Sequence, residues 1–156
     1  MTGSPARPEL EPLARFRVAL DPILDLGATP WGNRRIIPII GGTFDGPRLA
    51  GDILPGGGDW QIVHADGTAE IDTRYTLRTR DGAHIMLTTT GLRHGPPEVM
   101  ARIARGEQVD PGAYYFRLVL RFETADDRYA LLGRTIGIAS GARTADAVEY
   151  DAYTLT

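Results

Sequence analysis

The sequence contains neither cysteine nor lysine, so all 17 of its basic residues are arginine. Without a thiol, the chain cannot form a disulfide, a zinc–cysteine site or a cysteine nucleophile. Without a side-chain primary amine, it cannot support Schiff-base catalysis, pyridoxal phosphate attachment or the lysine of a phosphate-binding loop. These two absences remove whole classes of covalent and metal chemistry.

Long apolar runs and excess positive charge are also missing. No apolar run approaches the length that spans a membrane. A net charge of −3 and a pI near 5.6 supply no basic field that would attract nucleic acid or an anionic membrane. The opening segment MTGSPARPELEPL has neither the charged region nor the apolar region of a signal peptide. We therefore expect a cytoplasmic protein with no nucleic-acid or membrane partner.

Metal-binding and serine-nucleophile motifs are absent too. The histidines His64, His84 and His94 are far apart in the sequence, whereas metal sites usually show ligand pairs at short spacing. A structural or surface role is favoured for them. Ser4 and Ser140 are the only serines, and neither stands in a nucleophile-elbow motif. We expect the protein to function without a metal or another cofactor.

What the sequence does contain is a series of short β-forming runs separated by turn residues. Glycine-rich or Asp-Gly breakers fall at 41–42, 56–58, 66–67 and 81–82, and each interval between them has room for one strand. A chain of 156 residues that is 42% hydrophobic suits one domain with a real core. We expect a flexible N-terminal arm at residues 1–11 and a single domain at residues 12–156.

Alternation with a period of two locates most of the strands. Within residues 69–79, for example, Ile71, Tyr75 and Leu77 share one face, and Asp72 and Arg74 share the other. Strands are expected near residues 16–20, 36–40, 48–54, 60–64, 69–79, 83–89, 114–123, 128–140 and 147–155, and one helix is expected at residues 96–106.

Strands joined in sequence by short turns, with little helix to cover them, favour a closed barrel, because closure removes exposed sheet edges. We predict an all-β fold, an antiparallel up-and-down barrel of about 8–10 strands with one short helix. A β-sandwich is the alternative. The interior of such a barrel is either filled by side chains or holds one small ligand.

Several segments taken together resemble a known family. They are PWGNRRIIPIIGGTFDGPRLAGDILPGGGDW at 30–60, DGTAEIDTRYTLRTRDGAHI at 66–85 and GEQVDPGAYYFR at 106–117, with FET, RYALLGRT and GAR further on. In combination they resemble the uncharacterised bacterial family DUF3237, also called UPF0311, over nearly the whole chain from Leu10. The resemblance implies an antiparallel β-barrel with an internal cavity, and it implies no reaction. Where the family usually has leucine-asparagine-arginine, this chain has Leu132-Gly133-Arg134, so that amide is missing here.

Two aspartates are candidates for acid–base catalysis. Asp59 precedes Trp60, and a carboxylate beside a large aromatic ring can be desolvated, which raises its pKa toward the useful range. The alternative is a turn aspartate next to a core tryptophan. Asp72 lies within a strand, where aspartate is uncommon; it either faces the cavity or pairs with a cross-strand arginine.

A tyrosine and an arginine on one strand face are candidates for binding a substrate oxygen. Tyr115 and Arg117 share a face, and such a pair would bind and polarise a carbonyl or carboxylate group. The alternative is a structural ion pair between Arg117 and a carboxylate. Tyr75 and Arg134 join the predicted ligand-binding residues on strand position and on the family resemblance.

Two classes of function fit these candidates. One is a cofactor-independent isomerase, lyase or cyclase that acts by acid–base catalysis on a small carbonyl-bearing metabolite in the cavity, with Asp59, Asp72 and Tyr115 as catalytic residues and Trp60, Tyr75, Arg117 and Arg134 as ligand-binding residues. The other is a non-catalytic carrier or sensor of a small apolar ligand. A barrel filled by side chains, with a purely structural role, would have no cavity.

The strand expected at residues 114–123 carries large side chains on both faces. One barrel interior has room for only one of these faces, so the other is expected to contact a partner. A homodimer is the commonest arrangement of that kind.

Overall fold

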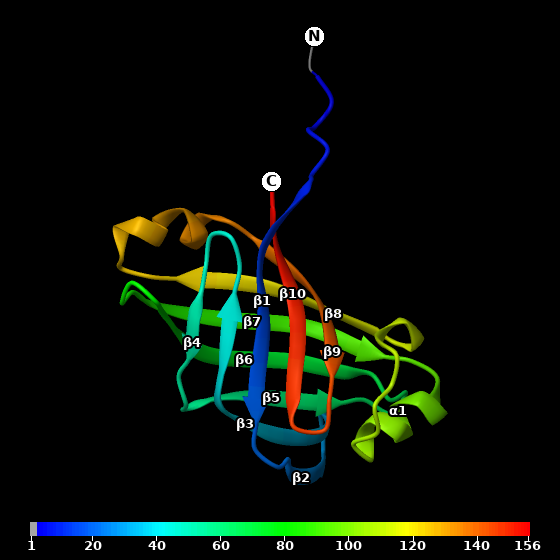
Figure 1. Ribbon diagram of the computed structural model, residues 1–156. Coiled ribbons are helices and arrows are strands. Elements are labelled where there is room, and N and C mark those ends of the chain that lie inside the picture. The colour runs from blue at the N-terminus through cyan, green and yellow to red at the C-terminus, as the bar shows by residue number, and fades with distance from the viewer. Residues whose placement is uncertain (1–2) are drawn as a thin grey trace.

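The computed structural model describes residues 3–156 as a barrel of antiparallel strands with one α-helix and two short 3-10 helices (Figure 1). The strands are β1 (Leu10–Leu20), β2 (Leu24–Thr29), β3 (Gly32–Asp45), β4 (Gly51–Ile53), β5 (Gly57–Val63), β6 (Ala69–Thr79), β7 (His84–His94), β8 (Tyr115–Glu123), β9 (Gly137–Arg143) and β10 (Ala147–Leu155). The helices are α1 (Pro97–Ala104), η1 (Pro111–Ala113) and η2 (Asp127–Arg134).

The sheet closes on itself as an eight-stranded barrel. Pairing runs from β1 through β10, β9, β8 and β7 to β6, then through β5 and β4 to β3, and β3 pairs with β1 to complete the ring. The short β4 and the longer β5 both lie between β3 and β6, one after the other along the same gap, and β2 pairs only with β3. The predicted barrel is confirmed. The sandwich alternative is wrong, because β1 and β3 pair with each other and so close the sheet into a ring.

Period-two alternation sorts the side chains into an inner and an outer set. In β6 the predicted inner set, Ile71, Tyr75 and Leu77 among them, is buried, whereas Glu70 and Arg74 are exposed. β6 and β7 form the predicted hairpin, with the turn at Asp81-Gly82. Gly82 has a φ of 90°, which an Asp-Gly turn can adopt without strain.

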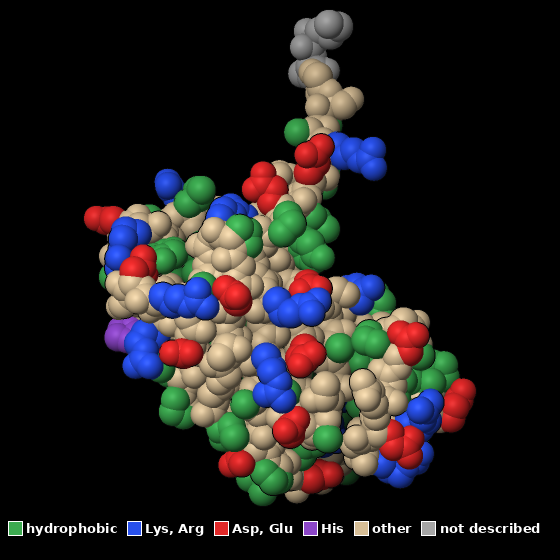
Figure 2. All heavy atoms as spheres, in the orientation of Figure 1, with side chains coloured by type: hydrophobic (Ala, Val, Ile, Leu, Met, Phe, Trp, Pro, Cys, Tyr) green, Lys and Arg blue, Asp and Glu red, His purple; other side chains and the backbone are tan. Residues whose placement is uncertain are grey.

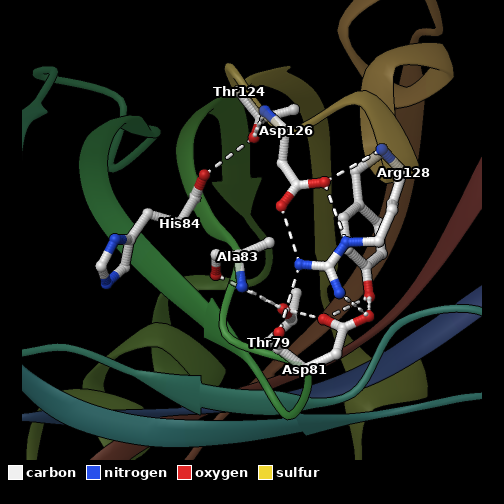
Figure 3. A network of polar contacts seen from close by, with 8 residues as sticks. Thr79, Asp81, Ala83, His84, Thr124, Asp126 and Arg128 are labelled. Atoms are coloured by element: carbon white, nitrogen blue, oxygen red, sulfur yellow. Dashed lines mark hydrogen bonds and ion pairs between the residues drawn. The ribbon is translucent and has the colours of Figure 1, made fainter.

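η2 packs over one end of the barrel, which we call the closed end, and a polar network joins it to the β6–β7 turn (Figure 3). Arg128 contacts Asp126 at 2.8 Å and Asp81 at 3.1 Å, and Tyr129 donates a hydrogen bond to Asp81 at 2.9 Å. The predicted strand at residues 128–140 is therefore wrong in its first half. Asp126 accepts a hydrogen bond from the backbone N–H of Arg128, which starts a helical turn, and Tyr129 and Leu132 then pack against the core.

The N-terminal arm is shorter than predicted. Glu9 and Thr156 exchange two backbone hydrogen bonds, of 2.8 and 2.9 Å, and β1 pairs with β10 from Leu10 onward. Both chain ends therefore leave the barrel together (Figure 1). The expected arm thus reaches only to residue 8, and residues 1–2 lie outside the described part of the chain.

The outer surface of β1 and β10 carries interspersed charges of both signs (Figure 2). Arg15 and Asp151 form a two-pronged ion pair at 2.7 and 2.9 Å, and Arg17 lies 3.5 Å from both Asp146 and Glu149. None of the helices formed by residues 3–156 combines the length and the apolar character that crossing a membrane would need.

Candidate functional site

A cavity of about 40 Å³ lies inside the barrel. Most of its wall is aliphatic or aromatic, as in Ile37, Ile39 and Phe116. Polar side chains from several strands also reach it, and they are Asp59, Gln61, Thr73, Tyr75, Thr89, Arg93, Arg143 and Tyr150. An apolar chamber with a few convergent polar groups is typical of a small-molecule site.

Asp59, on β5, is the single carboxylate among the residues that line this cavity, and only 7% of its surface is exposed. Its Oδ1 accepts a hydrogen bond from the backbone N–H of Asp72 at 3.0 Å, and its Oδ2 accepts one from Gln61 Nε2 at 3.1 Å. Burial raises the pKa of Asp59 above its usual value, against the opposing effect of these hydrogen bonds and of the positive charge on Arg93. The carboxyl group is therefore poised to exchange a proton closer to neutral pH than an exposed aspartate.

Gln61 connects Asp59 to Arg35. The glutamine is 1% exposed, and its Oε1 accepts a hydrogen bond from Arg35 Nε at 3.0 Å while its Nε2 donates to Asp59. This amide separates the guanidinium from the carboxylate, so Arg35 orients the site without forming a direct ion pair with Asp59. The positive charge of Arg35 remains available to a ligand.

Two hydroxyl pairs lie deeper in the barrel. The phenol groups of Tyr75 and Tyr150 hydrogen-bond to each other, and burial raises the pKa of both. The hydroxyls of Thr73 and Thr89 lie 2.6 Å apart. Within each pair only one O–H can donate to the other, so each pair keeps one proton to offer to a ligand oxygen or to water.

Arg93, on β7, has an unusual environment for an arginine. It is 8% exposed, its guanidinium lies 5.7 Å from the centre of the Phe116 ring, and its Nε has no hydrogen-bond partner among residues 3–156. Burial, with repulsion from Arg35 and Arg143, lowers the pKa of Arg93 to about 10. The group is still charged at neutral pH, so a buried cation faces the cavity without a paired anion.

Arg35 from β3, Arg93 from β7 and Arg143 from β9 form what we call the arginine cluster. The charges of Arg35 and Arg143 act on Arg93, and the pKa of each of the three is lowered, chiefly by burial. Within residues 3–156, no carboxylate oxygen lies within 4.0 Å of any of these guanidinium groups, whereas eight ion-paired arginines lie elsewhere on the barrel. The cluster therefore concentrates positive charge at one place.

The arginine cluster lies between the interior cavity and a larger open hollow, which we call the mouth. The mouth has a volume of about 730 Å³, and its walls come from α1, from the β1–β2 connection and from the β9–β10 turn. Leu20, Arg93 and Arg143 line both spaces, so the two are adjoining. The volume of the mouth falls within the roughly 300–1,000 Å³ of small-molecule sites, and that of the inner cavity does not.

The same fold and chain length are found in a known family. The family model for DUF3237, a protein family of unknown function, matches residues 8–155. The chain belongs to the DUF3237 family. A UPF0311 protein of Bradyrhizobium diazoefficiens is 41% identical over 84% of this chain and 86% of its own length.

A solved structure and a more distant relative are also similar to this chain over most of its length. A β-barrel-like protein from Acinetobacter baumannii AYE has a TM-score of 0.88 and 50% identity, covering 99% of this chain and all of the other. A protein of Penicillium roqueforti named PR-toxin biosynthesis cluster protein 7 is 26% identical over 80% of this chain and 77% of its own. The family resemblance seen in the sequence is thus confirmed.

Of the site residues predicted from the sequence, Asp59 and Tyr75 line the cavity of this DUF3237 barrel. Trp60 and Asp72 lie on the outer faces of β5 and β6, where they line a shallow hollow. Arg134 is exposed at the end of η2, near the closed end of the barrel. The predicted placement of Trp60, Asp72 and Arg134 in the cavity is wrong.

The predicted pair Tyr115 and Arg117 also lies outside. Tyr115 is 45% exposed, and the Arg117 guanidinium lies 5.3 Å from its ring centre on the outer face of β8. Phe116 and Leu118 occupy the inner positions of that strand. Alternation correctly placed Tyr115 and Arg117 together on one face of β8. The opposite face, with Phe116 and Leu118, lies inside the barrel, because burial of hydrocarbon is favoured over burial of a charged arginine.

Sequence reasoning missed Gln61, Tyr150 and all three members of the arginine cluster, Arg35, Arg93 and Arg143. A signal was present for Gln61 and Arg93: Gln61 is two residues from Asp59, and Arg93 is in phase with the buried Leu87 and Thr89 of β7. An arginine on the buried face of a strand is a functional-site candidate, because burying its charge without a partner costs free energy.

The side chains that commonly bind metal ions are dispersed over residues 3–156. Residues 3–156 contain no group of three or more side chains of histidine, cysteine, aspartate or glutamate that could hold a metal ion. His64 lies 2.5 Å from Glu70 on the outer face of the barrel. The polar groups that converge on the cavity are instead an amide, hydroxyls, guanidinium groups and one carboxyl group.

Proposed function

We propose that this protein binds a small carbonyl-bearing molecule at the mouth and transfers a proton on it by acid–base catalysis. The observation that carries the proposal is the buried carboxyl group of Asp59, whose raised pKa suits proton transfer, near Arg93, which has no anionic partner among residues 3–156. Clefts that hold both a perturbed acid and an unpaired cation are typical of catalytic sites.

In the proposed reaction, Asp59 removes a proton from the carbon next to the carbonyl group, or from a hydroxyl group, and returns it at another position. The negative charge that develops on the substrate oxygen is stabilised by the arginine cluster. The free hydroxyl proton of the pair formed by Tyr75 and Tyr150 is a donor for a second substrate oxygen. Isomerisation, elimination and ring closure all share this proton transfer, so the proposal covers an isomerase, a lyase or a cyclase.

The relative from Penicillium roqueforti supports a small organic substrate. Its name assigns it to a toxin biosynthesis cluster, and it matches most of this chain. A proton transfer of the proposed kind needs no bound cofactor, since the carboxyl group, the guanidinium groups and the hydroxyls supply the acid, the base and the charge stabilisation.

Deuterium exchange tests the proposal. The protein would be incubated in D₂O with a panel of small ketones, β-diketones and hydroxy-ketones, and incorporation of deuterium next to the carbonyl would be followed by proton NMR. We expect exchange above the uncatalysed rate for at least one compound, and a loss of about 100-fold or more in Asp59→Asn, in line with the size of general-base contributions.

Asp72→Asn is the matched control, because it makes the same change on the outer face of the neighbouring strand. We expect this variant to retain exchange. Equal activity in the wild type and Asp59→Asn would refute the assignment of Asp59 as the proton-transfer group.

A non-catalytic carrier is the second candidate, favoured by the mainly apolar wall of the interior cavity. A carrier would bind the ligand without any exchange of its protons, and Asp59→Asn would leave the affinity nearly unchanged. Native mass spectrometry of the purified protein, followed by release and NMR of any bound compound, separates the two candidates.

A further inference from the structure

The arginine cluster carries more positive charge than its surroundings balance. Arg35, Arg93 and Arg143 contribute three positive charges, and Asp59 contributes at most one negative charge at the cavity. Burying a cation without a partner costs free energy, so a buried and unpaired charge in a cleft marks a candidate ligand site. The excess of positive charge in the arginine cluster is therefore typical of a site that binds an anion.

The acidic residues around the mouth do not neutralise the cluster. Asp146 lines the mouth and acts on Arg143, but its nearest cation is Arg17, at 3.5 Å on the outer face. Asp25 acts on Arg35, and its Oδ1 accepts hydrogen bonds from Asn33 at 2.9 Å and from the backbone N–H of Gly27 at 2.8 Å.

The position of Arg93 indicates where the anion would bind. Its Nε is buried and unpartnered among residues 3–156, and its side chain lines both the mouth and the inner cavity. An arginine presents a planar fork of N–H donors that fits the two oxygens of a carboxylate. An acceptor at the junction of the two spaces would satisfy this orphan donor.

The volumes set the orientation of the ligand. The inner cavity, at about 40 Å³, has room for water or a small polar group but not for a ring. The mouth, at about 730 Å³, is walled on one side by Met100 and Ile103 of α1 and elsewhere by Ile23 and Val63. The apolar body of the ligand must therefore lie in the mouth, with its charged end directed inward.

We propose that the ligand of this site is a small organic carboxylate, held by its carboxylate on the arginine cluster and by its apolar body against α1. This inference rests on the proposed function, and it assigns the substrate class: an acid whose reacting carbon is next to the carboxylate anchored at the junction of the mouth with the inner cavity that Asp59 lines. Bound in this way, the substrate brings the negative charge that the cluster lacks.

Binding of matched acids and amides tests the inference. The probes are benzoate and 3-phenylpropionate, with benzamide and 3-phenylpropionamide as neutral analogues of the same shape, measured by calorimetry or ligand-observed NMR in low-chloride buffer. We expect an acid to bind at least about tenfold more tightly than its amide, and to weaken as the salt concentration rises. Phenyl phosphate is included to distinguish a carboxylate site from a phosphate site, and we expect it to bind more weakly than the acids.

Arginine variants localise the binding. Arg93→Met and Arg143→Met should each weaken binding of the acid about 10- to 100-fold, whereas Arg117→Met, which removes the same charge from the outer face, should leave it unchanged. Asp59→Asn should retain or tighten binding, because it removes a negative charge near the anion. Thermal melting and circular dichroism confirm that each variant is folded; the two single arginine variants are independent, so a folding defect in one leaves the other to decide.

The possible failures are distinguishable. Equal affinity for acids and amides, tighter binding of phenyl phosphate, or unchanged affinity in both folded arginine variants would overturn the carboxylate assignment. If deuterium exchange on neutral ketones persists in that case, the proposed proton transfer still stands. If acids bind as expected but no compound exchanges, the carboxylate site stands and the catalytic proposal fails.

Discussion

At the scale of single residues, Asp59 is expected to make the stability of the barrel depend on pH. Its pKa in the folded protein is raised above the usual 3.8 because the carboxyl group is buried. Between these two values the folded state holds a proton that the unfolded state releases. The stabilising effect is therefore fully present below pH 3.8 and is lost as the pH rises through the folded-state pKa.

We predict that the free energy of unfolding of Asp59→Asn increases relative to that of the wild type as the pH rises from about 3.5 to about 7, because the wild type loses a stabilising contribution over this range that the variant never had. The dependence of this free-energy difference on pH is compared, instead of its value at one pH. Any pH-independent effect of placing an asparagine beside Gln61 then cancels. Urea unfolding at several pH values measures the slope, and carboxyl ¹³C NMR measures the titration directly. A midpoint for Asp59 below 3.8 would contradict the prediction.

At the scale of elements, the contact between β1 and β3 closes the barrel and depends on Gly42. This glycine has a φ of 137°, and an added Cβ would lie 2.0 Å from the carbonyl oxygen of Arg17. A side chain there would force β1 away from β3, where Val18 pairs with Gly42. The closure of the sheet thus requires a residue without a side chain at this point.

We predict that Gly42→Ala lowers the free energy of unfolding by about 2–4 kcal/mol, from backbone strain together with the steric clash. Gly27→Ala is the matched control, since Gly27 also has a positive φ, of 84°, but no heavy atom lies within 4 Å of the position that an added methyl group would take. The control should lose only the strain contribution, about 1–2 kcal/mol. Chemical denaturation measures both losses. If Gly42→Ala and Gly27→Ala lowered the free energy of unfolding equally, the steric clash at Gly42 would contribute nothing, and the prediction would be wrong.

At the scale of the whole molecule, the outer face of β5, β7 and β8 carries exposed apolar side chains. Trp60, Leu92 and Val119 line a hollow of about 650 Å³ together with Trp31. Phe116 and its apolar neighbours occupy the inner positions of β8, and Val119 on its outer face lines this hollow. The homodimer expected from the sequence would use this face.

We predict a dimer by light scattering at micromolar concentration, and a shift to monomer in Leu92→Arg, because a charge replaces a buried contact at the centre of the interface. Met86→Arg makes a comparable change on the same face of β7, near the closed end of the barrel, and should leave the dimer intact. A monomer in the wild type at these concentrations would count against the prediction.

Much of the fold could be read from the sequence because strand alternation is a local property. The inner and outer sets of β6, the turn at Asp81-Gly82 and the helix near residues 97–104 each follow from residues close together in the chain. The segment at residues 127–134 was misjudged because its helical turns depend on contacts with the β6–β7 turn, 47 residues away between Asp81 and Arg128.

The sequence by itself determined that this chain forms antiparallel strands and which side chains of each strand lie together, and it favoured a barrel over a sandwich; the pairing of β1 with β3 decided between the two. The inner face of β8 also follows from the sequence, because it is the more apolar of the two faces, whereas only the tertiary structure decided which polar side chains from different strands meet at the cavity. Closure of the ring likewise brings Arg35, Arg93 and Arg143 together from β3, β7 and β9. No local pattern encodes that meeting, since each arginine is separated from the next by 50 or more residues and only strand pairing around the barrel sets their distance.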